Sequence, residues 1–76
     1  MQKFIIYVRR RGKDKYNMTN WGHDFIEKAL DNARSIMETI EKDTIGDHVK
    51  YRGMYRFTGV RIENDKGQTI YHEERN

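Results

Sequence analysis

The stretch from Phe25 to Lys42 constrains the fold most, because its apolar residues recur at the spacing of an amphipathic helix. They stand three and four positions apart, which places them on one stripe of a helix. The stripe consists of Phe25, Ile26, Ala29, Leu30, Ala33, Ile36, Met37 and Ile40. Charged residues occupy the opposite face. Because a helix with one apolar stripe must bury that stripe, the chain has to supply a second layer for it to pack on.

The predicted helix begins after Asp24, whose carboxylate can cap the first turn. Glu27, three residues later, would complete a start resembling a capping box, and Asn20 is an alternative cap one turn earlier. We expect the helix to stop near Asp43, before the loop at residues 46–48. The resulting rod would be about 27 Å long, enough to cross a small sheet.

Residues 3–10 are predicted to form the first strand of that second layer. Successive residues of a strand point to opposite faces. One face carries Phe4, Ile6 and Val8, and the other carries Ile5 and Tyr7. Apolar residues on both faces predict a central strand, or one whose second face is covered. A turn around Gly12 follows, after which residues 16–21 can return as a second strand.

Residues 50–63 form a second strand region, in which the apolar pattern changes phase. Tyr51, Tyr55 and Phe57 share one parity, whereas Val60 and Ile62 share the other. A glycine-assisted bulge at residues 58–59 would produce this change of face.

The segment Asn64-Asp65-Lys66-Gly67 predicts a tight turn into a last strand. With Gly67 in the left-handed conformation, Asn64 pairs with Gln68. This register sets Ile62 opposite Ile70 and Arg61 opposite Tyr71. The inward face of the hairpin would then hold Val60, Ile62, Ile70 and His72, and residues 73–76 would fray.

Together these elements predict an α+β fold of two layers. An antiparallel sheet of three to four strands is covered by one amphipathic helix, in the order β-(β)-α-β-β. The length of 76 residues allows a single α+β domain, 1–76, with one modest core. The chain has no Cys, which removes disulfides and thiolate metal sites. Because the expected stability margin is small, a homodimer is one possible state.

The sequence offers little chemistry for an enzyme. His23, His48 and His72 have neither a two-His helical spacing nor a neighbouring Cys, and Ser35 lacks a nucleophile-elbow context. The glycines form no phosphate-cradling loop. We therefore expect no enzyme, metal or cofactor. No stretch approaches the roughly 18 apolar residues of a membrane span, and no signal-like region opens the chain, so we expect a cytoplasmic protein with no membrane partner.

Charge is distributed unevenly along the chain. The net charge is +5 over residues 1–20, −4 over residues 21–48, +4 over residues 49–62 and −2 over residues 63–76. The helix is therefore acidic and the strands are basic. If the helix covers one face of the sheet, the positive charge should gather on the open face and its loop edge.

This basic surface also contains tyrosines, a mixture that suits nucleic acid. Guanidinium groups neutralise phosphates, and exposed aromatic rings stack on bases. The candidate residues are Arg9, Arg10, Arg11, Lys13 and Lys15, with Tyr51, Arg52, Tyr55 and Arg56 as a second group. Arg61, Tyr7 and Tyr71 are expected beside them. Their predicted role is to engage nucleic acid or a nucleoprotein without base-specific readout, with DNA and RNA both left open.

Other interpretations of the same residues stay open. The cations can form a solubilising rim around half-buried tyrosines, and Tyr and Arg are also enriched in protein–protein hot spots. The acidic helix face could imitate nucleic acid, although Lys28 and Arg34 interrupt its row of carboxylates.

The layout resembles the small ββαββ proteins of bacteriophages, which include anti-CRISPR and other anti-defence proteins. The resemblance is carried by a short N-terminal hairpin, by residues 25–34 (FIEKALDNAR) and by residues 59–67 (GVRIENDKG). It covers most of the chain as an architecture. It implies a non-catalytic protein that binds a host complex, sometimes with nucleic acid, so a phage-type inhibitor or adaptor is the alternative function. No diagnostic motif matches, and no binding residue is carried over.

Overall fold

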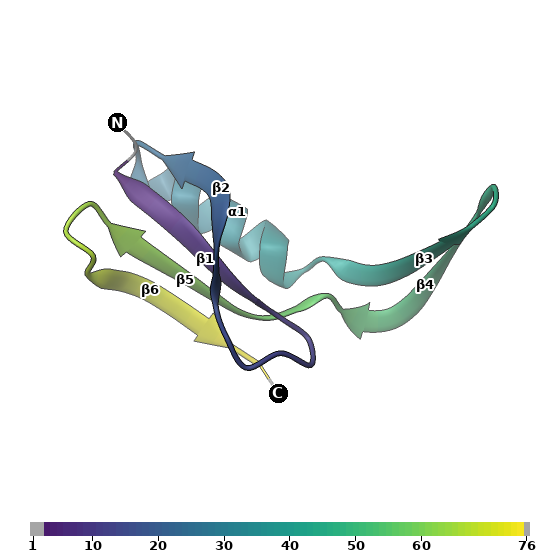
Figure 1. Cartoon of the computed structure of the whole chain (residues 1–76). Helices are drawn as coiled ribbons and strands as arrows, with labels where there is room; N and C mark the ends of the chain where they lie inside the picture. Colours follow the sequence, from purple (N-terminus) through teal and green to yellow (C-terminus); the bar gives the residue numbers. More distant parts are fainter. Residues whose placement is uncertain (1–2, 76) are drawn as a thin grey trace.

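The computed structural model describes residues 3–75, apart from the side chains of residues 43–45, 51 and 52. Within these residues a sheet, a helix packed on it and a projecting hairpin follow the order ββαββββ (Figure 1). The elements are β1 (Phe4–Arg10), β2 (Asn17–His23), α1 (Ile26–Met37), β3 (Ile40–Ile45), β4 (His48–Tyr55), β5 (Phe57–Asn64) and β6 (Thr69–Glu74). The predicted α+β architecture with one helix is confirmed.

The main sheet has four strands in the order β2-β1-β5-β6, and each neighbouring pair is antiparallel. Strand β1 lies between β2 and β5, as its apolar residues on both faces predicted. The second N-terminal strand also forms. It spans residues 17–23, whereas residues 16–21 were predicted.

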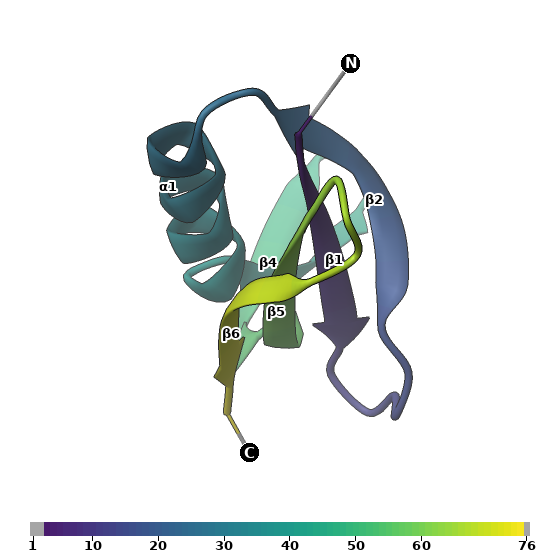
Figure 2. The ribbon, with the colours of Figure 1, turned by 90° about the vertical axis from the view of Figure 1, so that its left-hand side faces the viewer.

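The core lies between α1 and one face of this sheet (Figure 2). In β1 and β5, Ile6 pairs with Ile62 and Val8 with Val60, so four branched side chains form a compact apolar surface. The helix contributes Ala29, Ala33, Ile36 and Met37, and Phe57 completes the set of buried residues. The two alanines have no accessible surface, which shows how closely the helix approaches the strands.

The predicted change of face at residues 58–59 is confirmed. Arg9 pairs with Gly59, whereas the next residue, Arg10, pairs with Phe57. Strand β5 therefore bulges between Phe57 and Gly59. The bulge lets Phe57 and Val60 both point into the core although they have opposite parity.

The helix is shorter than predicted, because it ends at Met37 and not near Asp43. Ile40 continues the helical spacing but belongs to β3, where β-branched residues cluster and favour an extended backbone. Asp24 does not cap the helix: the N-cap is Phe25, and no side chain makes the cap hydrogen bond. In the described part of the chain, no helix has the length and apolarity that crossing a bilayer requires.

The predicted strand region 50–63 is in fact two strands in different sheets. Strand β4 pairs with β3 to form a two-stranded hairpin, and β5 pairs within the main sheet. Gly46 has a φ of 61° at the first position of the two-residue turn between β3 and β4, a backbone that glycine adopts readily. The predicted order β-(β)-α-β-β is therefore wrong, since it lacks this hairpin, which projects from the rest of the molecule (Figure 1).

The last hairpin has the predicted turn but a different register. Gly67 has a φ of 78°, and the Asn64 amide donates to the Gln68 carbonyl at 2.9 Å. An irregularity after Ile62 then shifts the pairing, so Ile62 lies opposite Tyr71 and not Ile70. As a result Ile70 and His72 are exposed, and Tyr71 packs against the core in their place.

Candidate nucleic-acid interface

The sheet face opposite α1 holds a connected group of polar side chains, which we call the Tyr16 network. Its members are Arg9, Tyr16, Arg61, His72 and Glu74. The Tyr16 hydroxyl donates to Glu74 Oε1 at 2.7 Å and lies 2.9 Å from His72 Nε2. The guanidinium carbons of Arg61 and Arg9 lie 5.0 Å and 5.5 Å from the centroid of the Tyr16 ring. This face is therefore internally paired.

Arg9 and Arg61 have further partners within the chain. Arg9 donates through Nε to Thr58 Oγ1 at 3.1 Å, and its Nη1 lies 3.2 Å from Glu74 Oε1. Arg61 lies 4.7 Å from the centroid of the Tyr7 ring, with its Nε 2.9 Å from Glu63 Oε2. Positive charge was predicted to gather on this open face, and both of these arginines are in ion pairs there.

Gly59 makes the position of Tyr16 possible. A Cβ atom placed on Gly59 would lie 2.8 Å from Tyr16 Cζ, closer than nonbonded carbon atoms can approach. The tyrosine ring therefore rests directly on the β5 backbone. The loop that precedes β2 is fastened to the sheet at this point.

The Tyr16 network couples stability to pH. Burial, together with the hydrogen bond to Glu74, raises the pKa of Tyr16 from 10.0 to about 12. The hydrogen bond from Tyr16 lowers the pKa of Glu74 below 4.5. A raised tyrosine pKa stabilises the fold fully below pH 10, and this contribution is lost as the pH rises through about 12. The lowered Glu74 pKa acts in the opposite direction, so its contribution is lost as the pH falls below 4.5.

We expect the free energy of unfolding to decline between pH 10 and about 12, and to decline less steeply in a Tyr16→Phe variant. Urea unfolding across this range measures the effect, and tyrosinate absorbance follows the titration directly. Burial also raises the pKa of Tyr71, so Tyr71→Phe is the matched control and should remove a different part of the titration. If Tyr16→Phe leaves the late part of the titration unchanged, the network does not hold that proton.

The end of β1 and the loop that joins it to β2 carry four exposed cations, Arg10, Arg11, Lys13 and Lys15, and we call this segment the basic loop. Among the residues that the structure describes, no ion pair involves these side chains. The loop is nevertheless anchored, because the Arg11 amide donates to the Arg56 carbonyl at 2.9 Å. The Lys13 amide donates to the Arg10 carbonyl at 3.0 Å, closing a turn in which Gly12 has a φ of 83°. The charges are thus held near one end of the sheet.

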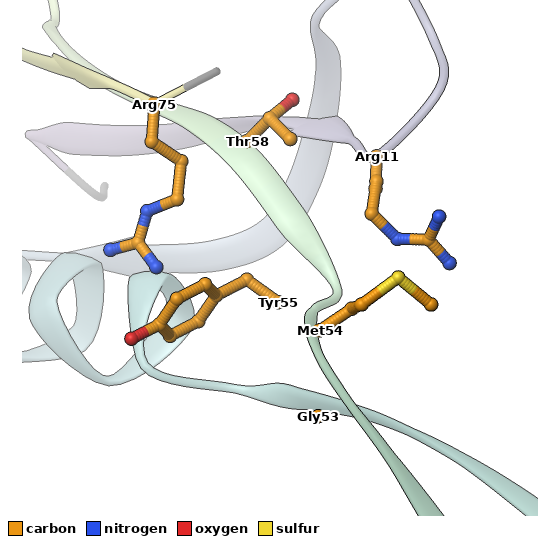
Figure 3. A pocket seen from close by; sticks show the side chains of 6 residues that line it. All are labelled: Arg11, Gly53, Met54, Tyr55, Thr58 and Arg75. Carbon is orange, nitrogen blue, oxygen red and sulfur yellow. The ribbon is translucent and has the colours of Figure 1, made fainter.

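A pocket of about 330 Å³ opens beside the basic loop, where the hairpin joins the main sheet (Figure 3). It is lined by Arg11, Gly53, Met54, Tyr55, Thr58 and Arg75. The guanidinium carbon of Arg75 lies 3.7 Å from the centroid of the Tyr55 ring. The pocket combines an apolar wall with two guanidinium groups.

The structure separates the predicted binding residues into distinct environments. Arg10, Arg11, Lys13 and Lys15 lie together and exposed, whereas Arg9 belongs to the Tyr16 network. Tyr55 lines the pocket, and Arg56 Nε is 3.9 Å from Glu41 Oε1. The side chains of Tyr51 and Arg52 lie outside the described residues. Tyr71 packs on the helix side of the sheet and contributes nothing to this surface.

Sequence reasoning missed Tyr16, Met54 and Arg75. Arg75 falls in the segment that was predicted to fray, but its amide donates to the Thr58 carbonyl at 2.9 Å. Residues 73 and 74 belong to β6, so the predicted fraying is wrong through residue 75. Arg75 directly follows the carboxylate-rich end of β6, and this position gives no local signal of the contact, which depends on the β5–β6 register.

Comparison with known proteins gives no relative of this chain. No protein-family model, curated protein or solved structure matches it.

Proposed function

We propose that this chain is a non-enzymatic binding protein that engages nucleic acid, or a nucleoprotein, through the phosphate backbone. The observation that carries the proposal is the basic loop, in which four exposed cations have no ion-pair partner among the described residues. Folding does not require these charges, because the loop is held by backbone hydrogen bonds. Phosphate oxygens are the partners that closely spaced Arg and Lys side chains neutralise.

The arrangement favours contact with the backbone over readout of base sequence. The loop is a short turn at the edge of a sheet, and it offers neither a recognition helix nor a row of amide side chains for base edges. Arg10, Lys13 and Lys15 would bind phosphates, and Arg11 would do so at the rim of the pocket. Arg9 has a supporting role in this proposal, since its guanidinium is already paired with Glu74 and Thr58.

Binding to labelled single- and double-stranded DNA and RNA, followed by fluorescence anisotropy at about 50 and 200 mM salt, tests the proposal. The loop variant is Arg10→Ala/Lys13→Ala/Lys15→Ala, which keeps the pocket residue Arg11. We expect its affinity to fall at least tenfold, because three phosphate contacts are lost. The slope of log affinity against log salt should become flatter by about 2, at roughly 0.7 per phosphate on a single strand.

The matched control is Lys3→Ala/Lys28→Ala/Lys66→Ala, which removes the same charge from exposed positions outside the loop. It should keep most of the affinity, whereas an equal loss in both variants would indicate attraction by net charge alone. Circular dichroism checks that each variant is folded. If the wild-type protein binds no nucleic acid at the lower salt concentration, the proposal is wrong.

The β3–β4 hairpin favours a second candidate function, which is to bind a host protein as an inhibitor or adaptor. This two-stranded sheet pairs with no other strand in the described chain, so it presents open edges. Its strand β4 also carries exposed apolar side chains: the exposed fraction is 50% for Val49, 39% for Met54 and 43% for Tyr55. An open strand edge can accept an extended segment of another protein. A pull-down from host lysate in which deletion of the hairpin abolishes capture would favour this function.

A further inference from the structure

The pocket beside the basic loop has walls suited to a flat ring. Tyr55 and Met54 form its apolar side, and Arg11 and Arg75 stand on either side of them (Figure 3). At about 330 Å³ it is at the small end of ligand pockets, a size for one planar group and not for a folded element of another protein. Because Tyr55 exposes 43% of its surface, an incoming ring can reach it.

Arg75 adds a charged plane to this wall. Its guanidinium is held over the Tyr55 ring, with 3.7 Å between the guanidinium carbon and the ring centroid. A guanidinium plane held in this way offers both a stacking surface and hydrogen-bond donors. Nucleobases carry carbonyl and ring-nitrogen acceptors on a planar, stackable frame.

We propose that the pocket receives one unstacked base of a single-stranded nucleic acid whose neighbouring phosphates lie on the basic loop. This inference rests on the proposed function and deepens it, because it specifies that the nucleic acid is single-stranded and adds a contact to one of its bases. A duplex keeps its bases stacked and paired, whereas the bases of a single strand can turn onto aromatic rings and guanidinium planes. Arg11 belongs to both the loop and the pocket, so it links the phosphate contacts to the base contact.

An abasic strand separates the base contact from the phosphate contacts. The probes are an oligothymidylate about ten nucleotides long and a strand of equal length made of abasic deoxyribose phosphates. Both carry the same charge, but only the first has bases. We expect the wild-type protein to bind oligothymidylate about 5- to 150-fold more tightly, the range expected for stacking one base. Tyr55→Ala should remove most of this preference and leave the affinity for the abasic strand and its salt slope unchanged.

The matched control is Val49→Ala, which truncates another exposed residue of β4 that does not line the pocket, and it should keep the full preference. Arg75→Gln, which keeps a hydrogen-bond donor but removes the charged plane, should lower the preference as well. Should Tyr55→Ala fold poorly, this second variant carries the test.

If the wild-type protein binds the two strands equally tightly, the proposal that the pocket receives a base is wrong. If that equal binding weakens with salt, the proposed function still holds. If the protein binds neither of these two strands, the single-strand inference is wrong, and the proposed function then depends on the anisotropy measurements with duplex DNA and with RNA. A free nucleotide has the same chemistry as a base in a strand, so thymidine monophosphate is the competitor. If it displaces the strand at concentrations near the Kd of the strand itself, the pocket serves a free nucleotide and the single-strand inference is wrong.

Discussion

Replacing Ile62 with Ala is expected to lower the free energy of unfolding by about 2 to 5 kcal/mol, the range for large-to-small changes in a core. Ile62 has no exposed surface, and it pairs with Ile6 across the centre of the sheet beneath the helix. A domain of this length is expected to be stable by roughly 4 to 11 kcal/mol, at about 0.05 to 0.15 kcal/mol per residue. The variant should therefore lose a large share of its stability, as urea unfolding followed by circular dichroism would show.

Ile70→Ala is the matched control, because it makes the same chemical change on the strand next to Ile62. Ile70 exposes 41% of its surface, so its truncation should cost under about 1 kcal/mol. If the two variants are destabilised equally, Ile70 faces the core, and the register that places Tyr71 opposite Ile62 is wrong.

Gly59→Ala is expected to destabilise the protein by about 1 to 3 kcal/mol, although alanine normally suits a strand better than glycine. The new methyl group would displace the Tyr16 ring, which lies against the glycine. The displaced ring would lose its hydrogen bond to Glu74 and its contacts with Arg9 and Arg61. The cost thus arises from the partners of Tyr16 and not from the β5 backbone itself.

A double-mutant cycle isolates this cause. In a Tyr16→Ala background no ring covers Gly59, so Gly59→Ala should be neutral or should stabilise by about 0.5 to 1 kcal/mol. The four proteins of the cycle are compared by urea unfolding at neutral pH. A similar loss in both backgrounds would mean that the strand, and not the tyrosine, rejects the side chain.

Sequence periodicity predicted the parts of the fold that depend on local pattern. The stripe from Ile26 to Met37 predicted the helix, the parity change predicted the bulge near Gly59, and the Asn64–Gly67 segment predicted its turn. The end of the helix was not predictable in this way. Ile40 satisfies the helical spacing and the strand propensity at once, and the pairing of β3 with β4 decides between them.

The charge of the candidate site was predictable from the sequence, but the contacts that each of its arginines makes within the chain were not. Adjacent arginines in the sequence look alike, yet Arg9 points to Glu74 on a strand 65 residues away, while Arg10 and Arg11 stay exposed. Because strand residues alternate between faces and β5 bulges beside them, only the β1–β5 and β5–β6 registers distinguish these side chains. The contact of Arg75 with Tyr55 depends on the same registers.

The two anchors of the basic loop bear on the thermodynamics of association. The Arg11 amide is bound to the Arg56 carbonyl at one end, and Tyr16 is bound to Glu74 at the other. The loop backbone is therefore ordered when the chain folds, so a ligand does not have to order it again. Loss of the Tyr16 anchor should appear as a more unfavourable entropy of binding, even though every cation of the loop is still present.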